Sequence, residues 1–314
     1  MEKTVPVIGN PSAPDYFSRN TTKILKAIAI IFLIAGHFYV FCIKGGNGIL
    51  SLGGEWAVLI FLIVSAMGLC KSYGLDHCGK GFIYKRLARI IFPLWLSSGL
   101  FYSLDFFILH KTYPLSHIVS SFAGILQKAP PNSPAWFVSF IIYLYLMFFF
   151  VSYVPLPKFL KCIAIVFISV GTSVLIARVP LLSNSIGGWC TYSLAFPLSI
   201  CIMAYGKVIS HCLQWLYVRF LPGLIALGLA LALLYFTMRS GKTIFFVGFI
   251  AVAVVFIDKL KSIPKSLAFL GDHSFELYLM HFPFGMENFR MKCSMSEGIS
   301  SLLSRRGGRN IWIT

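Results

Sequence analysis

Long apolar stretches dominate the chain, and short polar segments separate them. Each stretch holds about 20 residues, the length of an α-helix that crosses a hydrocarbon core of about 30 Å. A soluble protein would instead show short apolar runs broken by polar turns. The pattern therefore predicts an all-α fold, a polytopic transmembrane bundle of about nine helices. The predicted spans are residues 23–43, 52–70, 88–109, 135–154, 160–178, 189–206, 219–238, 243–257 and 266–282.

The composition supports the same fold class. Hydrophobic residues make up 58% of the chain and charged residues only 12%, whereas soluble domains carry about 25% charged residues. So few charges cannot cover the surface of a water-soluble protein of 314 residues. A lipid bilayer needs no such cover, so we expect the bilayer to be the main environment of this chain.

Basic residues are distributed unevenly along the chain, whose net charge is +17. With the N-terminus in the cytoplasm, 16 of the 27 lysines and arginines fall in inside segments, 6 in outside segments and 5 after residue 283. This asymmetry is the positive-inside pattern of membrane proteins. The charge therefore predicts a multi-pass protein of the plasma (inner) membrane with a cytoplasmic N-terminus, and it requires no nucleic-acid partner.

The polar segments at the two ends predict the domain organisation. Residues 1–22 form a polar cytoplasmic leader that lacks the basic start and cleavage site of a signal peptide, so we expect the first span to be retained. Residues 23–283 form one membrane domain, and residues 284–314 form a polar, irregular tail. Between the third and fourth spans, the amphipathic stretch 116–127 is typical of a segment that lies at the membrane interface.

Neither a disulfide framework nor a metal site is predicted. The eight cysteines are scattered and form no C-x-x-C pair. His273 and His281 are eight residues apart rather than the four that a helical zinc site needs. We therefore expect no metal.

Lys26 and His37 are the first candidates for chemistry. They are eleven residues apart, so on a helix they share one face, with an axial separation of about 16 Å. Lys26 would then lie at the cytoplasmic boundary and His37 near or beyond the midplane of the bilayer. Ionisable groups inside spans are costly and are often functional. His37 is therefore either a catalytic group or a hydrogen-bonding residue between helices.

Arg86 and Arg89 open the third span one turn apart, on one helix face. Paired guanidinium groups suit bidentate binding of phosphate. The alternative is that both simply follow the positive-inside rule and contact lipid headgroups.

Two further segments carry an unusual polar load. Residues 270–283 contain Asp272, His273, Glu276 and His281 within a predicted span. Glu55 opens the second span on the outer side, toward which His37 points. A carboxylate there would orient the imidazole or raise its basicity; alternatively, Glu55 is an interfacial residue in contact with water.

Taken together, these segments resemble the acyltransferase 3 family of integral membrane acyltransferases. The resemblance runs from about Lys23 to Pro283 and covers five elements in order. They are Lys26 with His37; Phe61 to Ser65-Ala66; Arg86 and Arg89 with Pro93; Trp136; and Gly271, Ser274, Phe275, Tyr278, Leu279, His281 and Pro283.

The resemblance implies a function. Family members move an acyl group, commonly acetyl, from cytoplasmic acyl-CoA to a hydroxyl of an extracytoplasmic glycan. By this resemblance His37 is the general base, with Glu55 as a possible acidic partner, and Lys26, Arg86 and Arg89 contact the CoA. Trp136, Ser274, Tyr278 and His281 are further candidates. Acyl-CoA is the expected donor substrate rather than a permanently bound cofactor, a carbohydrate is the expected acceptor, and a homo-oligomer is compatible with the sequence.

The sequence departs from the family pattern in three places. The acidic position of the second helix holds Leu59, no glutamate follows Trp136, and the usual final helix does not follow Pro283. Two alternatives therefore stay open at this point. One is a transporter or exporter of a glycan-linked or organic-acid solute, although no inverted repeat is visible. The other is an inactive acyltransferase that is truncated at its C-terminus.

Overall fold

The computed structural model describes residues 17–42, 52–76, 78–79, 81–108, 110–124, 134–179, 188–206, 208, 247–248, 250, 253–254, 257 and 263–281. Over these residues the regular secondary structure is helical, as predicted. The predicted span 219–238, most of span 243–257, most of the leader and the tail 284–314 lie outside the described residues.

Five helices in the described part of the chain are long and apolar enough to cross a membrane, and they confirm a helical membrane bundle. They are α1 (Arg19–Cys42), α2 (Gly53–Tyr73), α3 (Phe82–Phe107), α5 (Ala135–Tyr153) and α6 (Lys158–Arg178). The shorter helices are α4 (Leu115–Phe122), α8 (Gly188–Tyr192), α9 (Ala195–Ala204), α13 (Lys265–Asp272) and α14 (Ser274–Met280).

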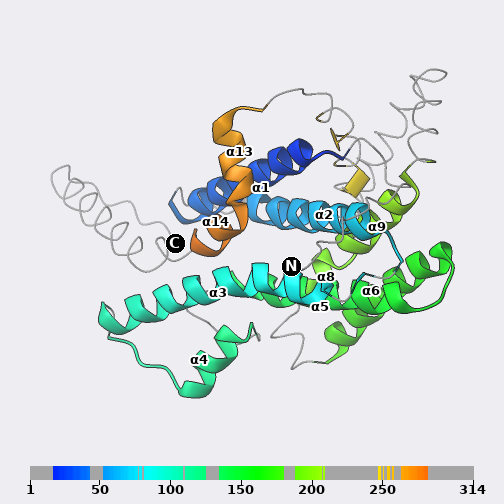
Figure 1. Ribbon diagram of the computed structural model, residues 1–314. Coiled ribbons are helices and arrows are strands. Elements are labelled where there is room, and N and C mark those ends of the chain that lie inside the picture. Colours follow the sequence, from blue (N-terminus) through cyan, green and yellow to red (C-terminus); the bar gives the residue numbers. More distant parts are fainter. Residues whose placement is uncertain are drawn as a thin grey trace, which may run out of the picture.

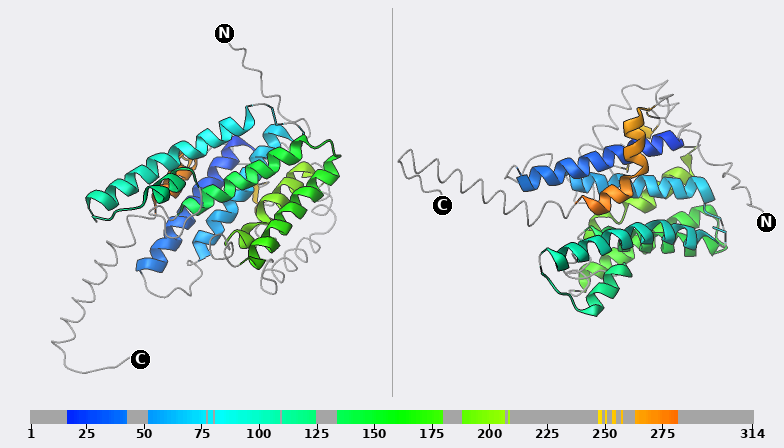
Figure 2. Two further views of the ribbon diagram at one scale, coloured as in Figure 1. Left: turned by 90° about the horizontal axis from the view of Figure 1, so that it is seen from below. Right: turned by 60° about the vertical axis from the view of Figure 1, so that its left-hand side comes forward.

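Helix α2 lies at the centre of the bundle. It packs against α1 and α9, and 72% of its apolar 18-residue stretch is buried inside the bundle. In Figure 1, α1 and α2 run side by side in an upper layer, while α3, α5 and α6 form a lower layer. Helix α13 crosses α1 steeply, and α14 turns from it toward α3 (Figures 1 and 2). The site described below lies between the two layers.

Local sequence accounts for several of the helix starts. Pro114, Pro134, Pro157 and Pro264 directly precede α4, α5, α6 and α13, where a fixed φ and a missing N–H cost nothing. Helix α1 starts at Arg19, four residues before the predicted span, because the Ser18 hydroxyl accepts a hydrogen bond from the Thr21 amide (3.1 Å). Helix α3 likewise starts at Phe82, before the predicted residue 88, so Arg86 and Arg89 lie within it.

The predicted span 189–206 is wrong as a single helix, because it is broken into α8 and α9. Pro197 has no N–H to donate to the carbonyl of Ser193, four residues earlier. The hydroxyl of Ser169 on α6 donates to that carbonyl instead, at 2.7 Å. A side chain of the neighbouring helix therefore satisfies the backbone group that the proline leaves unpaired.

The predicted span 266–282 is also divided, into α13 and α14, which meet at His273. Next to this break the hydroxyl of buried Ser274 donates to the Gly271 carbonyl at 3.0 Å. The change of direction brings α14 against both α1 and α3.

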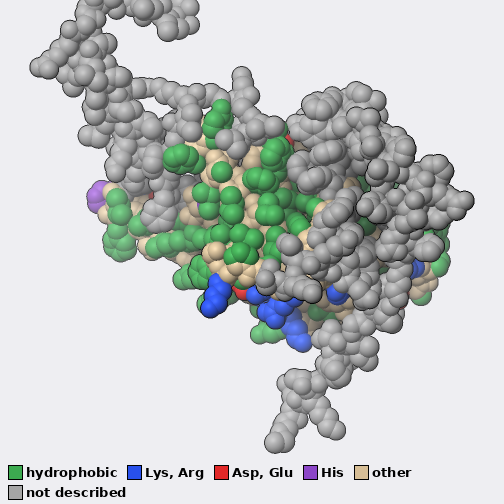
Figure 3. Space-filling model, turned by 90° about the horizontal axis from the view of Figure 1, so that it is seen from above, with side chains coloured by type: hydrophobic (Ala, Val, Ile, Leu, Met, Phe, Trp, Pro, Cys, Tyr) green, Lys and Arg blue, Asp and Glu red, His purple; other side chains and the backbone are tan. Residues whose placement is uncertain are grey.

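Apolar side chains cover much of the bundle surface in Figure 3, and basic side chains gather along one edge of it. Phe92 on α3 is 69% exposed and Phe167 on α6 is 77% exposed. Exposed apolar surface of this extent is expected where lipid replaces water around the helices.

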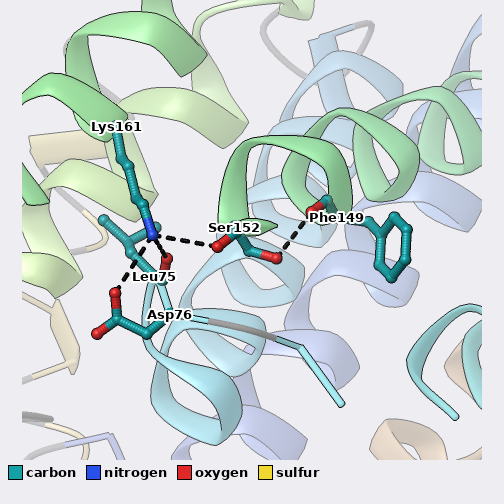
Figure 4. Close-up of polar contacts among 5 residues, drawn as sticks. All are labelled: Leu75, Asp76, Phe149, Ser152 and Lys161. Atoms are coloured by element: carbon teal, nitrogen blue, oxygen red, sulfur yellow. Dashed lines mark hydrogen bonds and ion pairs between the residues drawn. The ribbon is translucent and has the colours of Figure 1, made fainter. Parts of the chain in front are cut away.

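Lys161 ties three chain segments together at the start of α6 (Figure 4). Its buried ammonium group donates to the carbonyls of Leu75 (2.8 Å) and Ser152 (3.1 Å), just after α2 and in the last turn of α5. The last carbonyls of a helix have no hydrogen-bond donor within that helix. The Lys161 ammonium supplies a donor to the Ser152 carbonyl at the end of α5. Its ion pair with Asp76 (3.3 Å) adds little, because that carboxylate side chain is 91% exposed.

We expect Lys161→Met to destabilise the bundle, because it leaves two buried carbonyls unpaired at about 1–3 kcal/mol each. Thermal unfolding in detergent, followed by tryptophan fluorescence, measures the loss. The matched control is Lys158→Met, in the same turn, which removes a contact over the Tyr205 ring (5.6 Å) worth about 0.5–1 kcal/mol at an exposed site. Equal effects of the two substitutions would contradict the carbonyl-capping role.

Candidate functional site

Glycines fix the position of α1. A Cβ atom added to Gly53, at the start of α2, would lie 2.3 Å from the Phe32 carbonyl oxygen and 3.0 Å from the Gly36 Cα. A Cβ atom added to Gly271, in α13, would lie 2.2 Å from the Lys23 carbonyl oxygen. Both helices therefore contact α1 backbone to backbone, as small residues allow in membrane bundles. These contacts set where the side chains of α1 point.

Lys26, Arg86 and Arg89, which the sequence predicted as donor-binding residues, line one cavity of about 720 Å³. Lys26 comes from α1, and the two arginines come from the first turns of α3. The guanidinium carbon of Arg86 lies 5.7 Å from the centre of the Tyr73 ring on α2, a cation–π contact that helps hold the side chain in place. The structure thus brings Lys26 together with an arginine pair that lies 60 residues later in the sequence.

Arg19 adds a fourth cation to the cavity wall, and Asp272 and Glu276 add two carboxylates. Asp272 also pairs with Lys23, whose ammonium lies 2.6 Å from a carboxylate oxygen. The positive charge at this end of the cavity exceeds the negative charge. Such a surface favours a polyanionic ligand.

Away from the cations the cavity becomes apolar. Phe61 and Val64 of α2 and Phe137 and Ile141 of α5 line this part, which we call the apolar end. The hydroxyls of Ser65 and Tyr145 also line the wall and lie 2.6 Å apart. At 1.5 Å per residue, Phe137 lies about 12 Å from Tyr145 along the axis of α5, toward the start of that helix. The cavity therefore leads from a basic region into the hydrophobic interior.

His37 does not line this cavity but pairs with His281 of the C-terminal element. Their ring centroids are 5.0 Å apart, with an angle of 33° between the planes. His281 Nδ1 lies 2.5 Å from the Tyr278 carbonyl oxygen. A carbonyl only accepts hydrogen bonds, so Nδ1 carries the proton and Nε2 of the neutral ring keeps its lone pair. Two imidazoles, predicted separately from the sequence, thus form one pair.

Three aromatic rings lie between the cavity and this histidine pair. Phe61, Phe137 and Tyr278 contact one another, with centroid distances of 6.3, 5.9 and 5.1 Å; we call them the ring cluster. Tyr278 in turn lies 5.6 Å from the His281 ring. The sequence placed Lys26 and His37 on one helix face, and the structure shows the ring cluster between the cavity that Lys26 lines and the His37–His281 pair.

The remaining predicted residues surround the two parts of the site. Glu55 follows Gly54, which lies beside the His37 ring: a Cβ atom on Gly54 would be 3.5 Å from His37 Nε2. Trp136 stacks on the Tyr192 ring at 5.9 Å. The Tyr278 hydroxyl donates to the Pro134 carbonyl at 3.3 Å and ties α14 to the start of α5. Glu55 thus follows a residue beside His37, Trp136 and Tyr278 lie at the ring cluster, and Ser274 lines the cavity.

Residues 22–286 match the family model described as an acyltransferase domain. The chain belongs to the acyltransferase 3 family. Neither the curated proteins nor the solved structures gave a match to this chain. Membership and the membrane helices together make it a membrane-embedded acyltransferase.

In this acyltransferase 3 protein, Arg19 and Tyr145 line the cavity but were not predicted from the sequence. Arg19 was counted only among the basic residues of the positive-inside pattern. It lies seven residues before Lys26, which is nearly two full helical turns, so both side chains share one face of α1. Tyr145 lies in an apolar run and carried no signal. Its place opposite Ser65 depends on the packing of α5 against α2.

We expect Gly271→Ala to push α13 away from α1, because the new methyl group would overlap the Lys23 carbonyl. Overpacking of this kind costs typically 1–3 kcal/mol, and it also strains the Lys23–Asp272 pair. Thermal unfolding of the purified protein measures the loss. Gly171→Ala on α6 is the control, since nothing lies within 4 Å of its added Cβ, and it should be neutral or stabilising by up to about 1 kcal/mol. A neutral Gly271→Ala would refute the close contact.

Proposed function

We propose that this protein is an O-acyltransferase that moves an acyl group, acetyl above all, from cytoplasmic acyl-CoA to a hydroxyl of a cell-envelope glycan. One observation carries the proposal: a single cavity joins a basic region to an apolar end, and an imidazole pair lies behind that end. A CoA thioester has the matching order of parts, with phosphates at one end and an acyl group at the other.

The basic region suits the phosphates of CoA. Arg86 and Arg89 on one helix face offer planar, bidentate donors for phosphate oxygens, and Lys26 and Arg19 add charge from the facing helix. A family resemblance assigns the same role to Lys26 and the arginine pair. On this proposal the basic end of the bundle faces the cytoplasm, where acyl-CoA is found, and the protein lies in the plasma membrane.

The histidine pair suits activation of the acceptor. His37 takes the proton of the acceptor hydroxyl while its oxygen attacks the thioester carbonyl carbon. A C–O bond forms, the C–S bond breaks, and the departing CoA sulfur takes the proton from His37. The products are an acyl ester and free CoA thiol. His281, with Nδ1 held by a carbonyl, keeps a defined tautomer beside His37. In this proposal Glu55, which follows Gly54 in the first turn of α2, orients the His37 imidazole.

We expect His37→Ala to lower acyl transfer by about 10²–10⁴-fold, the usual contribution of a general base. The assay supplies radiolabelled acetyl-CoA and a cell-envelope glycan to the purified enzyme in proteoliposomes. The control is His110→Asn: His110 is exposed, and asparagine tolerates its positive φ of 53°. Equal transfer by wild type and His37→Ala would defeat the assigned role, and uptake of an unmodified solute without acyl transfer would favour a transporter.

We expect Arg86→Ala to weaken binding of CoA by roughly 10- to 100-fold, because it removes a charge-assisted contact worth about 1.5–3 kcal/mol. Equilibrium binding of CoA to the detergent-solubilised protein measures this without any acceptor. Arg178→Ala provides the matched control, because Arg178 is exposed in the last turn of α6, outside the cavity. The phosphate-binding role fails if both variants bind CoA as tightly as the wild type.

A further inference from the structure

The hydroxyls of Ser65 and Tyr145 form a pair in the cavity wall that the proposed reaction does not use. Their oxygens lie 2.6 Å apart, and both residues line the cavity. The buried Tyr145 ring also lies 6.4 Å from the ring of Phe196, a fully buried residue of α9. Because α2 holds the phenol oxygen and α9 holds the ring, the Tyr145 hydroxyl has a defined place in the wall.

One proton of this pair is available to a ligand. Each hydroxyl carries one O–H donor, and the hydrogen bond between the two hydroxyls uses only one of them. Among the described residues, neither Ser65 nor Tyr145 has a second hydrogen-bond partner for its hydroxyl. Thr22 and Ser274 line the same cavity, but their hydroxyls already donate to backbone carbonyls three or four residues earlier. The pair can therefore donate into the cavity without giving up its own contact.

The pair lies at a depth that suits the middle of a bound acyl-CoA. The Arg86 guanidinium lies over the Tyr73 ring, so Tyr73 marks how deep along α2 the proposed phosphate contacts lie. Ser65 is eight residues before Tyr73, about 12 Å along the helix axis. The pantetheine arm of CoA has about 12 bonds between its phosphate oxygen and its sulfur, which extend to about 15 Å. Its two amide groups fall within that length.

An amide carbonyl in the arm needs the kind of donor that the pair offers. The arm loses water when it enters the cavity, and a carbonyl that is left without a donor there costs free energy. The guanidinium and ammonium groups are engaged with the phosphates in the proposed complex. The spare hydroxyl proton, between those cations and the apolar end, supplies a neutral donor to the neutral part of the ligand.

We infer that Tyr145, oriented by Ser65, donates a hydrogen bond to an amide carbonyl of the pantetheine arm of acyl-CoA. In this arrangement the Ser65 hydroxyl donates to the phenol oxygen, and the phenol O–H donates to the ligand. The inference rests on the proposed function and adds a contact that distinguishes CoA from a free nucleotide. Tyr145 is a substrate-binding residue here and takes no part in proton transfer.

The test compares the binding of CoA with that of 3′-phospho-ADP, the nucleotide part of CoA without its pantetheine arm. Equilibrium binding to the detergent-solubilised protein is measured for wild type and Tyr145→Phe. We expect Tyr145→Phe to bind CoA about 3- to 10-fold more weakly, the change that one neutral hydrogen bond makes. Its affinity for 3′-phospho-ADP should equal that of the wild type, which also shows that the variant is folded.

Ser65→Ala is a second variant, which keeps the test valid if Tyr145→Phe fails to fold. The phenol keeps its proton in this variant but loses the hydroxyl that orients it. We therefore expect the same pattern, with a smaller loss of CoA affinity and an unchanged affinity for 3′-phospho-ADP.

Tyr143→Phe is the matched control. Tyr143 lies on α5 two residues before Tyr145, and its hydroxyl is paired with the Thr172 hydroxyl of α6 at 2.7 Å, outside the cavity. The control loses a hydroxyl of the same kind and should bind both ligands as the wild type does.

Three results overturn the inference. The first is wild-type affinity for CoA in both Tyr145→Phe and Ser65→Ala, the second is an equal loss of affinity for CoA and 3′-phospho-ADP, and the third is an equal loss of CoA affinity in Tyr143→Phe. A wild type that binds neither CoA nor 3′-phospho-ADP would instead overturn the proposed function.

Discussion

At Gly53 and Gly271 the backbone of α1 meets the backbones of α2 and α13 with no side chain between them. Lipid gives helices little hydrophobic reason to associate, so close packing of small residues has to hold them together. Lys26 and His37 both lie on the helix that these contacts hold. Lys26 in the cavity and the half-buried imidazole of His37 therefore owe their positions to glycines that have no chemistry of their own. The Lys23–Asp272 ion pair, next to Gly271, reinforces the same crossing.

Much of this arrangement could be predicted from the sequence, because it follows from local patterns. The length and apolarity of the stretches predicted α1, α2, α3, α5 and α6 to within a few residues at most ends. Helical periodicity placed Arg86 and Arg89 on one face, and the structure brings both to the cavity that Lys26 lines. The catalytic and binding roles of these residues stay predictions, since position alone does not assign chemistry.

What the sequence did not predict depends on partners that are distant along the chain. Pro197 breaks a run that hydropathy reads as one span, and only the packing of α6 shows that Ser169 compensates. Lys161 counted as one more inside charge, yet its ammonium is buried on two carbonyls of other segments. The contact between His37 and His281 joins the first and last described helical elements, and no local signal reports such a pairing.

The ring cluster also bears on how a membrane can hold a polar cavity at all. A water-filled path from one face of the bilayer to the other would let ions follow the membrane potential. Within the described part of the chain, the rings of Phe61, Phe137 and Tyr278 lie between the cavity and the His37–His281 pair. Packed aromatic groups exclude water and leave an ion no hydration shell. A charged donor bound at the cations would therefore meet aromatic rings, and not open water, on the way toward His37.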